Sequence, residues 1–270
     1  MTVYIKTHGR PNKQLTYNTL RDLGYTDKII FMVDDEDDTS DLLTQYGEEI
    51  VKFHKQYYVD AIDCGSDSPK RDVNLYAWCA CEDHAKSSHC DIFIMADDDI
   101  TGFRYRYKED RKLKSLRITH NLDTMFEYIS EYMVSADVSA MSTGIPQMYF
   151  SGDIESSLWK WRVPYTFIFR NSKYRVNWVS EYEEDVITAI NSANEGQYMF
   201  VFPMVQRDTV TMGSNEGGMH SSYSDNFKNS QYGYIWNPSC EEIIRYKGKY
   251  MCKIKRDNAF PKLISSRCKI

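Results

Sequence analysis

Three consecutive aspartates, Asp97, Asp98 and Asp99, follow an apolar run of β-favouring residues at positions 92–96. Adjacent carboxylates repel each other, and burial strengthens the repulsion, so this placement indicates a positive partner. Alternate side chains of an extended segment point to the same side, so Asp97 and Asp99 can aim together while Asp98 points away or caps the next turn. Mg²⁺ and Mn²⁺ prefer carboxylate oxygens, often together with substrate phosphates. The spacing therefore predicts a divalent-metal site that makes a nucleoside diphosphate a better leaving group.

Three explanations compete for the triplet. The first is a solvated acidic turn at a strand end. The second is a phosphatase of the haloacid dehalogenase type, because the run from Asp97 to Thr101 matches Asp-x-Asp-x-Thr, with Asp97 as the nucleophile. That motif normally follows the first strand, whereas roughly three strand–helix units precede it here. The third is a nucleotide-sugar transferase. Since no glycine-rich phosphate loop is present, a metal must compensate most of the phosphate charge, assisted by Arg10 and Arg71.

Strands and helices alternate over the first 100 residues, which favours a parallel sheet with helices on its faces. Ligands of such sheets bind at the carboxyl ends of the strands. Polar clusters follow three of these ends, at residues 7–10, 34–38 and 97–99, and we expect them to surround one crevice. The predicted strands are 2–7, 28–34, 49–54 and 90–99, and the predicted helices are 12–24, 39–47 and 72–87.

The second half of the chain has a less regular pattern. It predicts helices at 118–136 and 180–194, strands at 138–150, 163–171 and 197–206, and a mobile loop rich in glycine and asparagine at 212–227.

The composition is that of a soluble globular protein. Of its residues, 42% are hydrophobic and 27% are charged. The length of 270 residues suits one large domain or two small ones. The seven cysteines are irregularly spaced and form no zinc motif, which favours free thiols in a reducing cytoplasm, the host cytoplasm if the protein is viral. No apolar stretch approaches the ~20 residues of a membrane span, and no signal peptide is expected.

The net charge of −6 argues against a protein that coats nucleic acid generally, but two segments are locally basic. Residues 103–117 and 245–269 interleave aromatic side chains with Lys and Arg. Such segments could grip phosphates and stack on bases. The alternative is a solvated helix face for the first segment and a basic tail for the second.

The chain resembles glycosyltransferases of the GT-A fold in four places: "THGR" and "VDDED" after the first two strands, the "RDVNLYAW" segment, and "IMADDD". The resemblance implies an α/β fold, with a Rossmann-type nucleotide-binding half on a mainly parallel central sheet and a mixed α/β acceptor-side half. We expect a single domain over residues 1–270, divided at 102/103, with a basic C-terminal segment.

The resemblance also implies roles for individual residues. The ends of the first two strands hold the base and ribose of the donor, the arginine before the acidic strand contacts the diphosphate, and the acids bind Mn²⁺ or Mg²⁺. Carried over by position, the donor-binding residues are Thr7, His8, Arg10, Asp34, Arg71 and Asp98, and the metal ligands are Asp97 and Asp99.

Two later segments fit the same family. "EYEEDV" resembles its acceptor-facing element, so Glu184 or Asp185 is the catalytic base that deprotonates an acceptor hydroxyl. An acidic first helical turn is the structural alternative. His220 matches a late histidine that completes metal coordination, although a loop histidine is often merely exposed. Gly217 and Gly218 favour a loop that closes over the donor.

The more specific similarity is to bacteriophage transferases that glycosylate hydroxymethylated bases in DNA, including the group associated with base-oxidising enzymes. It implies a UDP-sugar donor, a hexosyl- or pentosyltransferase reaction, a hydroxymethylpyrimidine acceptor flipped out of duplex DNA, and no membrane partner. Trp159, Trp161 and Trp178 could form the acceptor wall or pack in the core. The alternatives are transfer to polysaccharide or protein, a nucleotidyltransferase, and a nucleotide- or nucleic-acid-binding protein without catalysis.

Overall fold

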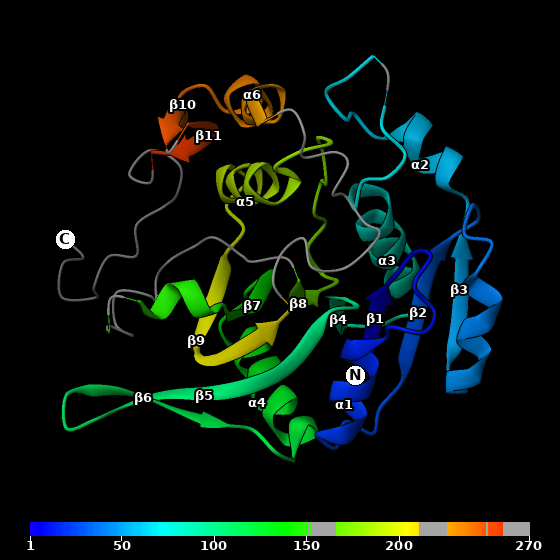
Figure 1. Cartoon of the computed structure of the whole chain (residues 1–270), viewed down its shortest axis with the longest axis vertical. Helices are drawn as coiled ribbons and strands as arrows, with labels where there is room; N and C mark the ends of the chain where they lie inside the picture. Colours follow the sequence, from blue (N-terminus) through cyan, green and yellow to red (C-terminus); the bar gives the residue numbers. More distant parts are fainter. Residues whose placement is uncertain (68, 151, 153–165, 211–225, 247, 256–270) are drawn as a thin grey trace.

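A computed structural model describes residues 1–67, 69–150, 152, 166–210, 226–246 and 248–255. Among these residues, nine strands form one sheet in the order β3-β2-β1-β4-β8-β7-β9-β5-β6 (Figure 1). The strands are β1 (Thr2–Lys6), β2 (Ile29–Asp34), β3 (Glu49–Phe53), β4 (Ile92–Asp97), β5 (Ile100–Glu109), β6 (Lys112–Arg117), β7 (Ala140–Gly144), β8 (Phe167–Asn171) and β9 (Met199–Thr209). A separate antiparallel pair comprises β10 (Glu241–Tyr246) and β11 (Lys249–Ile254).

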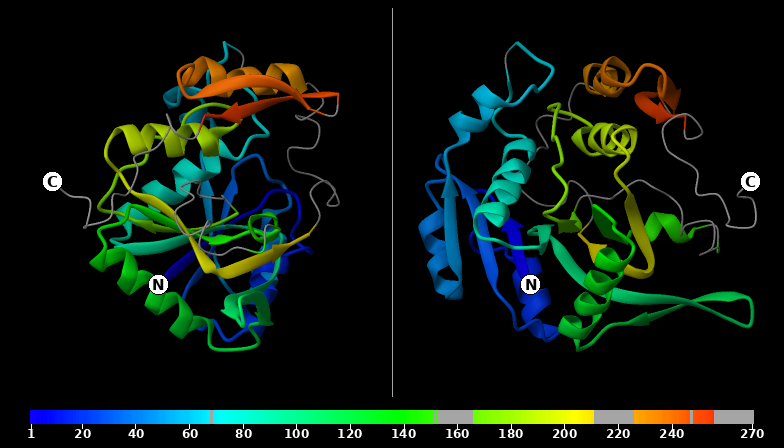
Figure 2. Two further views of the ribbon diagram at one scale, coloured as in Figure 1. Left: turned by 90° about the vertical axis from the view of Figure 1, so that its left-hand side faces the viewer. Right: turned by 180° about the vertical axis from the view of Figure 1, so that it is seen from behind.

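The helices cover both faces of the sheet (Figure 2). They are α1 (Leu15–Asp22), α2 (Lys55–Ala61), α3 (Leu75–Ser87), α4 (Leu122–Ser135), α5 (Glu184–Asn194) and α6 (Asn226–Trp236), with short 3₁₀ segments η1 (Ser40–Tyr46) and η2 (Pro146–Tyr149).

The first half is the predicted parallel α/β unit. β3, β2, β1 and β4 are parallel neighbours. β8 pairs antiparallel with β4 and with β7, and β5 pairs antiparallel with β9 and with β6, so the second half is mixed. The predicted α/β class with a mostly parallel central sheet is confirmed.

Side-chain alternation along β1 shows how the sheet separates two cores. Val3 and Ile5 pack in the cluster that contains Phe126 of α4. Tyr4, between them, packs in the opposite cluster with Trp78 of α3. Lys6 continues the alternation on the Tyr4 face, and this periodicity places a lysine under α3 at the end of the strand.

Several local predictions differ from the structure. Residues 40–46 form a 3₁₀ helix rather than an α-helix, and at seven residues it is longer than most 3₁₀ helices. The sequence patterns do not predict α2, α6 or the β10–β11 pair, and the predicted strand at 138–150 is β7 followed by the 3₁₀ segment η2. Residues 103–117 are not a helix face but the β5–β6 hairpin, because aromatic and basic residues alternate with the period of two that a strand requires. Most of the predicted loop at 212–227 lies outside the described residues.

Candidate active site

The acid triplet lies at the point of the sheet where the chain order reverses. β2 lies on one side of β1 and β4 on the other, and the register places Lys6 beside Asp97. Open α/β sheets bind ligands at the carboxyl ends of strands at such a point. Thr16 of α1 holds the turn, because its hydroxyl donates to the Asp97 carbonyl (2.5 Å) and accepts from the Ile100 N–H (2.9 Å).

Asp97 is paired with a lysine that sequence patterns did not identify. Lys6 Nζ lies 2.7 Å from Asp97 Oδ1, and the lysine side chain is only 4% exposed. The same ammonium stands 3.1 Å from the ring centroid of Trp78, where the ring quadrupole stabilises a cation. Trp78 stacks on Trp178, which is buried, so Trp178 belongs to the core packing beneath the site.

Asp98 is buried and connects the triplet to the loop after β1. Its Oδ2 accepts a hydrogen bond from the Thr7 hydroxyl (2.6 Å), and its Oδ1 lies 3.1 Å from Arg10 Nη2. Gln14 donates to the Thr7 hydroxyl (2.9 Å). Burial raises the pKa of Asp98, while Arg10 and Thr7 oppose the rise. Asp98 therefore binds Thr7 and Arg10 and holds them beside the triplet, and it does not cap the next turn.

Asp99 has the properties of a cation ligand. Its Oδ1 is buried and accepts no hydrogen bond from any residue in the described part of the chain. Burial, together with repulsion from Asp97 and Asp98, raises the pKa of Asp99 to about 6. A buried carboxylate oxygen without a donor is unfavourable unless a proton or a cation occupies it. A carboxylate donor set suits the hard cations Mg²⁺ and Mn²⁺, so these residues fit a divalent metal.

A buried arginine stands opposite the acids. Arg207 of β9 is 2% exposed, and it donates to the Thr143 carbonyl (2.7 Å) and to the Thr166 hydroxyl. Burial lowers the pKa of Arg207 to about 10, although the charges of Asp97 and Asp99 oppose the decrease. The positive partner that the triplet predicts thus includes side chains of the protein itself, namely Lys6, Arg10 and Arg207.

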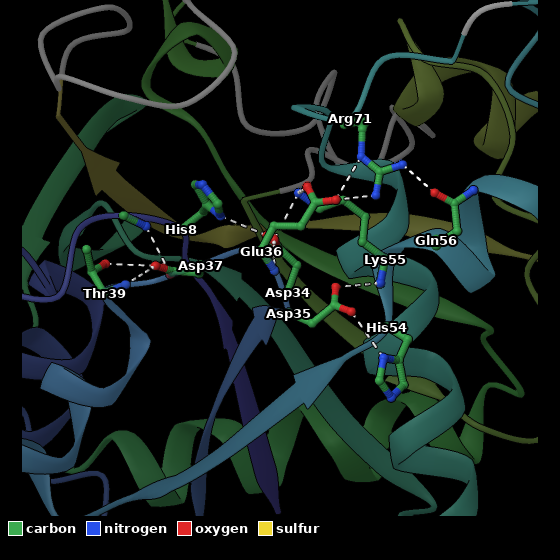
Figure 3. A network of polar contacts seen from close by, with 11 residues as sticks. His8, Asp34, Asp35, Glu36, Asp37, Thr39, His54, Lys55, Gln56 and Arg71 are labelled. Carbon is green, nitrogen blue, oxygen red and sulfur yellow. Dashed lines mark hydrogen bonds and ion pairs between the residues drawn. The ribbon is translucent and has the colours of Figure 1, made fainter.

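Asp34, at the end of β2, is the centre of a second polar network (Figure 3). His8 Nδ1 lies 2.8 Å from its Oδ2, and Lys55 Nζ lies 2.9 Å from its Oδ1. Burial opposes ionisation here, but hydrogen bonds from His8 and Lys55 outweigh it and lower the pKa of Asp34 to about 2. His8 and Asp34, both expected at the donor site, are therefore in direct contact.

Arg71 joins this network from the segment that precedes α3 (Figure 3). Its Nε donates to Glu36 Oε1 (2.8 Å), and its Nη1 donates to Gln56 (2.6 Å). Lys55 binds the same Glu36 at 3.0 Å. Arg71 consequently lies at the β2 end of the site, with its charge partly compensated by Glu36.

The His8–Asp34 pair predicts a pH-dependent stability. The hydrogen bond to Asp34 raises the pKa of His8, so the contribution of this pair is fully present below the unfolded histidine pKa of about 6.5 and is lost as the pH rises through the folded value. We expect wild type to lose more unfolding free energy than His8→Gln between pH 6 and pH 8. The difference should stay below about 1 kcal/mol because His8 is 57% exposed.

Urea denaturation of both proteins at the two pH values measures this difference. His54→Gln is the matched control, since His54 also contacts an aspartate, Asp35, but its side chain is 88% exposed. An equal loss of stability in wild type and His8→Gln would contradict the ionic pair.

Glu184 and Asp185 occupy the first turn of α5, as predicted, but their environments differ. Burial, together with the charge of Asp185, raises the pKa of Glu184 well above its usual range, while Lys6 opposes the rise. Glu184 is therefore close enough to Lys6 to be influenced by the cation beside Asp97. Asp185 Oδ1 instead accepts a hydrogen bond from the Val186 N–H (2.6 Å), so it binds one of the backbone donors that the first turn of α5 leaves without a helical acceptor.

A further group of potential metal ligands lies between the start of α5 and the β10–β11 pair. Ligand atoms of Glu183, Glu241 and Cys252 lie within 4.8 Å of one another. Burial and the two carboxylates raise the pKa of the Cys252 thiol, which disfavours the thiolate that binds metals. The predicted ligand His220, the glycines at 217–218, and Trp159 and Trp161 lie outside the described residues.

Comparisons with known proteins agree with this arrangement. Residues 1–218 match the model of the TET-Associated Glycosyltransferase family. The match spans most of the chain, so the protein belongs to this family of glycosyltransferases, and the predicted enzyme class is confirmed. No curated protein shows a significant sequence match. Among the described residues, no helix is long and apolar enough to cross a membrane.

Solved structures with the same fold include glucosyl-3-phosphoglycerate synthase from Mycobacterium tuberculosis. The structure with Mn²⁺, uridine diphosphate and phosphoglyceric acid aligns with a TM-score of 0.52 at 8% identity, covering 94% of this chain and 85% of that chain. Its complex with uridine diphosphate gives a TM-score of 0.48 at 8% identity, covering 94% and 86%. At this identity the first alignment establishes the fold, which is the expected GT-A type.

Proposed function

We propose that the protein transfers a sugar from a nucleoside diphosphate sugar, specifically a UDP-sugar, to a hydroxymethylated pyrimidine in phage DNA, in the host cytoplasm. The observation that carries the donor chemistry is Asp99, a half-buried carboxylate whose buried Oδ1 accepts no hydrogen bond from the described residues, at the switch point of a glycosyltransferase sheet.

Two findings on related proteins support the choice of donor and acceptor. The synthase that shares the fold was crystallised with Mn²⁺ and uridine diphosphate. The family is described as TET-associated, which agrees with the similarity to phage transferases that accompany base-oxidising enzymes.

Asp97 and Asp99 would hold Mn²⁺ or Mg²⁺, with His220 as the proposed third ligand. The ion would neutralise the diphosphate and so stabilise the leaving nucleoside diphosphate. Lys6 and Arg207 would keep the two carboxylates ionised and in place.

The donor would extend from this site toward β2. Asp98 positions the loop after β1, and the second polar network offers His8 and Asp34 to the base and ribose. Arg71 would bind phosphate after exchanging Glu36 for the donor. The proposed donor-binding residues are therefore Thr7, His8, Arg10, Asp34, Arg71 and Asp98.

Glu184 is the better candidate for the base. Its raised pKa makes the ionised carboxylate a stronger proton acceptor than an ordinary glutamate, whereas Asp185 is engaged by the backbone. Glu184 would take the proton of the acceptor hydroxyl as the oxygen attacks the sugar.

A transfer assay tests this proposal. Duplex oligonucleotides with hydroxymethylcytosine or unmodified cytosine are incubated with UDP-sugars and with sugars on other nucleotides, in Mn²⁺ or in EDTA, and product masses are measured. We expect one added sugar only on the hydroxymethylated strand, only with Mn²⁺ or Mg²⁺, and best with a UDP-sugar. Failure to release nucleoside diphosphate from any donor would overturn the donor chemistry. Transfer to polysaccharide or protein alone would overturn the DNA acceptor.

A further inference from the structure

The β5–β6 hairpin is an arm that projects from the body of the protein. Its far end extends beyond the other elements both in Figure 1 and in the rear view of Figure 2. Only the first half of β5, Ile100 to Tyr105, pairs with β9, whereas the second half pairs with β6 alone. A two-stranded ribbon without a covering layer contributes little to its own stability, so its sequence is free to serve binding.

The arm concentrates positive charge. Residues 103–117 contain seven Lys or Arg and only two acidic residues, in a chain whose net charge is −6. Lys114 has a distant partner in Glu109 at 3.8 Å. Among the described residues neither Lys112 nor Arg117 forms an ion pair with a carboxylate, although Lys112 lies opposite Glu109 in the strand register. Both side chains are exposed.

Cross-strand pairing places like charges opposite each other. Arg104 faces Arg117 in the register, an arrangement that destabilises a ribbon unless an anion intervenes. Asp208 compensates Arg104 at 2.6 Å, which leaves Arg117 for an external anion.

The opposite face of the arm carries exposed aromatic and aliphatic side chains beside charged ones. Tyr105 pairs across the ribbon with Leu116, and Tyr107 with Lys114. Tyr105 is 39% exposed, Tyr107 42% and Leu116 58%. Rings and a basic side chain on one face suit a surface that combines phosphates with the apolar edges of sugars and bases.

The tip of the arm holds an arginine in a backbone conformation that is unfavourable for a long side chain. Asp110 and Arg111 have φ angles of 48° and 61°, the left-handed pair of a two-residue hairpin turn. Glycine is the residue that adopts this conformation without cost, and a long side chain in it is unusual. The turn therefore places the guanidinium of Arg111 at the far end of the arm.

We propose that the β5–β6 hairpin binds duplex DNA through its phosphates and thereby holds the acceptor beside the acid triplet. This inference rests on the proposed function and identifies the surface that recognises the acceptor. β5 begins immediately after Asp99 and is 10 residues long. At about 3.3 Å per residue the whole strand spans on the order of 30 Å, and the part that pairs with β6 alone, residues 106–109, spans about 13 Å. The major groove accepts a two-stranded ribbon.

The salt dependence of DNA binding tests the arm. The pair Lys112→Gln/Lys114→Gln is compared with Lys28→Gln/Lys52→Gln, which removes two charges beside β2 and β3, at the other edge of the sheet. Affinity for an unmodified duplex is measured by fluorescence anisotropy over a range of salt concentrations. In the arm variant the slope of log K against log salt should be less steep by about 2, because each lost phosphate contact removes about 0.9 from its magnitude. The control should keep the wild-type slope.

Arg111→Gly separates binding from folding. Since glycine relieves the left-handed φ, this variant should unfold at the wild-type temperature or above it and still lower the salt slope by about 1. Release of UDP from the donor without acceptor should be unchanged in all of these variants.

The outcomes distinguish this inference from the proposed function. If wild type glycosylates DNA and the arm variants bind and modify it equally well, the arm proposal is overturned while the function stands. If wild type releases UDP but does not bind duplex DNA, the arm and the DNA acceptor are both overturned while the donor chemistry stands. Weaker binding by the arm variants alone, with donor hydrolysis intact, supports the arm.

Discussion

Asp99→Asn is expected to lower sugar transfer by at least about a thousandfold, the scale on which metal-assisted charge stabilisation acts, while the fold remains as stable as wild type or becomes slightly more stable. The loss follows from removing the carboxylate whose Oδ1 accepts no hydrogen bond from the described residues. The retained stability follows from the raised pKa of about 6, because a group whose charged form is disfavoured by folding costs stability when ionised. Steady-state transfer rates and thermal unfolding measure the two effects.

Asp38→Asn is the matched control, because Asp38 is an exposed acid in the cluster after β2. Its transfer rate should stay close to wild type. If Asp99→Asn retains activity, Asp99 is not a metal ligand. If it unfolds the protein, Asp99 has a structural role instead.

Glu184→Gln should lower kcat by about 10²- to 10⁴-fold, the usual contribution of a positioned base, with little change in KM for the donor. The amide is isosteric but cannot accept a proton at neutral pH. Because burial makes ionised Glu184 unfavourable, the folded protein should tolerate the neutral residue. Single-turnover transfer rates as a function of pH measure the effect. We expect the wild-type rate to rise with pH as Glu184 ionises, and we expect no such rise in the variant.

Asp185→Asn provides the comparison on the same helical turn. Its carboxylate binds the Val186 N–H, so we expect a modest loss of stability and a transfer rate within about tenfold of wild type. A large loss of rate in Asp185→Asn, with Glu184→Gln near wild type, would move the base to Asp185.

Local patterns predicted the elements with strong periodicity and the acids at their ends. The apolar runs before Asp34 and Asp97 specify buried parallel strands, and polar residues after such strands must meet at one edge of the sheet. The helix α2 was missed because Tyr57, Tyr58 and Val59 favour strands by propensity, and tertiary packing overrides that preference.

The counter-charges of the site could not be predicted because they depend on partners distant in the sequence. Lys6 and Asp97 become neighbours only through the β1–β4 register. Lys55 meets Asp34 only after α2 forms, and the charge of Arg207 on β9 interacts with those of Asp97 and Asp99. The sequence did offer one signal for these residues. A lysine or arginine inside an apolar strand, or directly beside one, is unusual unless it is paired with an acid.

The β5–β6 hairpin differs from the counter-charges, because part of its character could be predicted from the sequence. The basic and aromatic composition of residues 103–117 was visible in the sequence, but its geometry was not. A period of two across Arg104, Tyr105, Arg106 and Tyr107 is the strand signal, and the two-residue turn at Asp110 completes it. Its acidic-then-basic turn lacks the glycine that usually marks a hairpin.

Anomalous diffraction from crystals grown with Mn²⁺ and uridine diphosphate tests the central claim most directly, that the acids after β4 hold a divalent ion against a diphosphate. We predict a manganese peak bound by carboxylate oxygens of Asp97 and Asp99 and by the diphosphate. A peak at Glu183, Glu241 and Cys252 instead, or bound uridine diphosphate with no manganese at the triplet, would contradict the account.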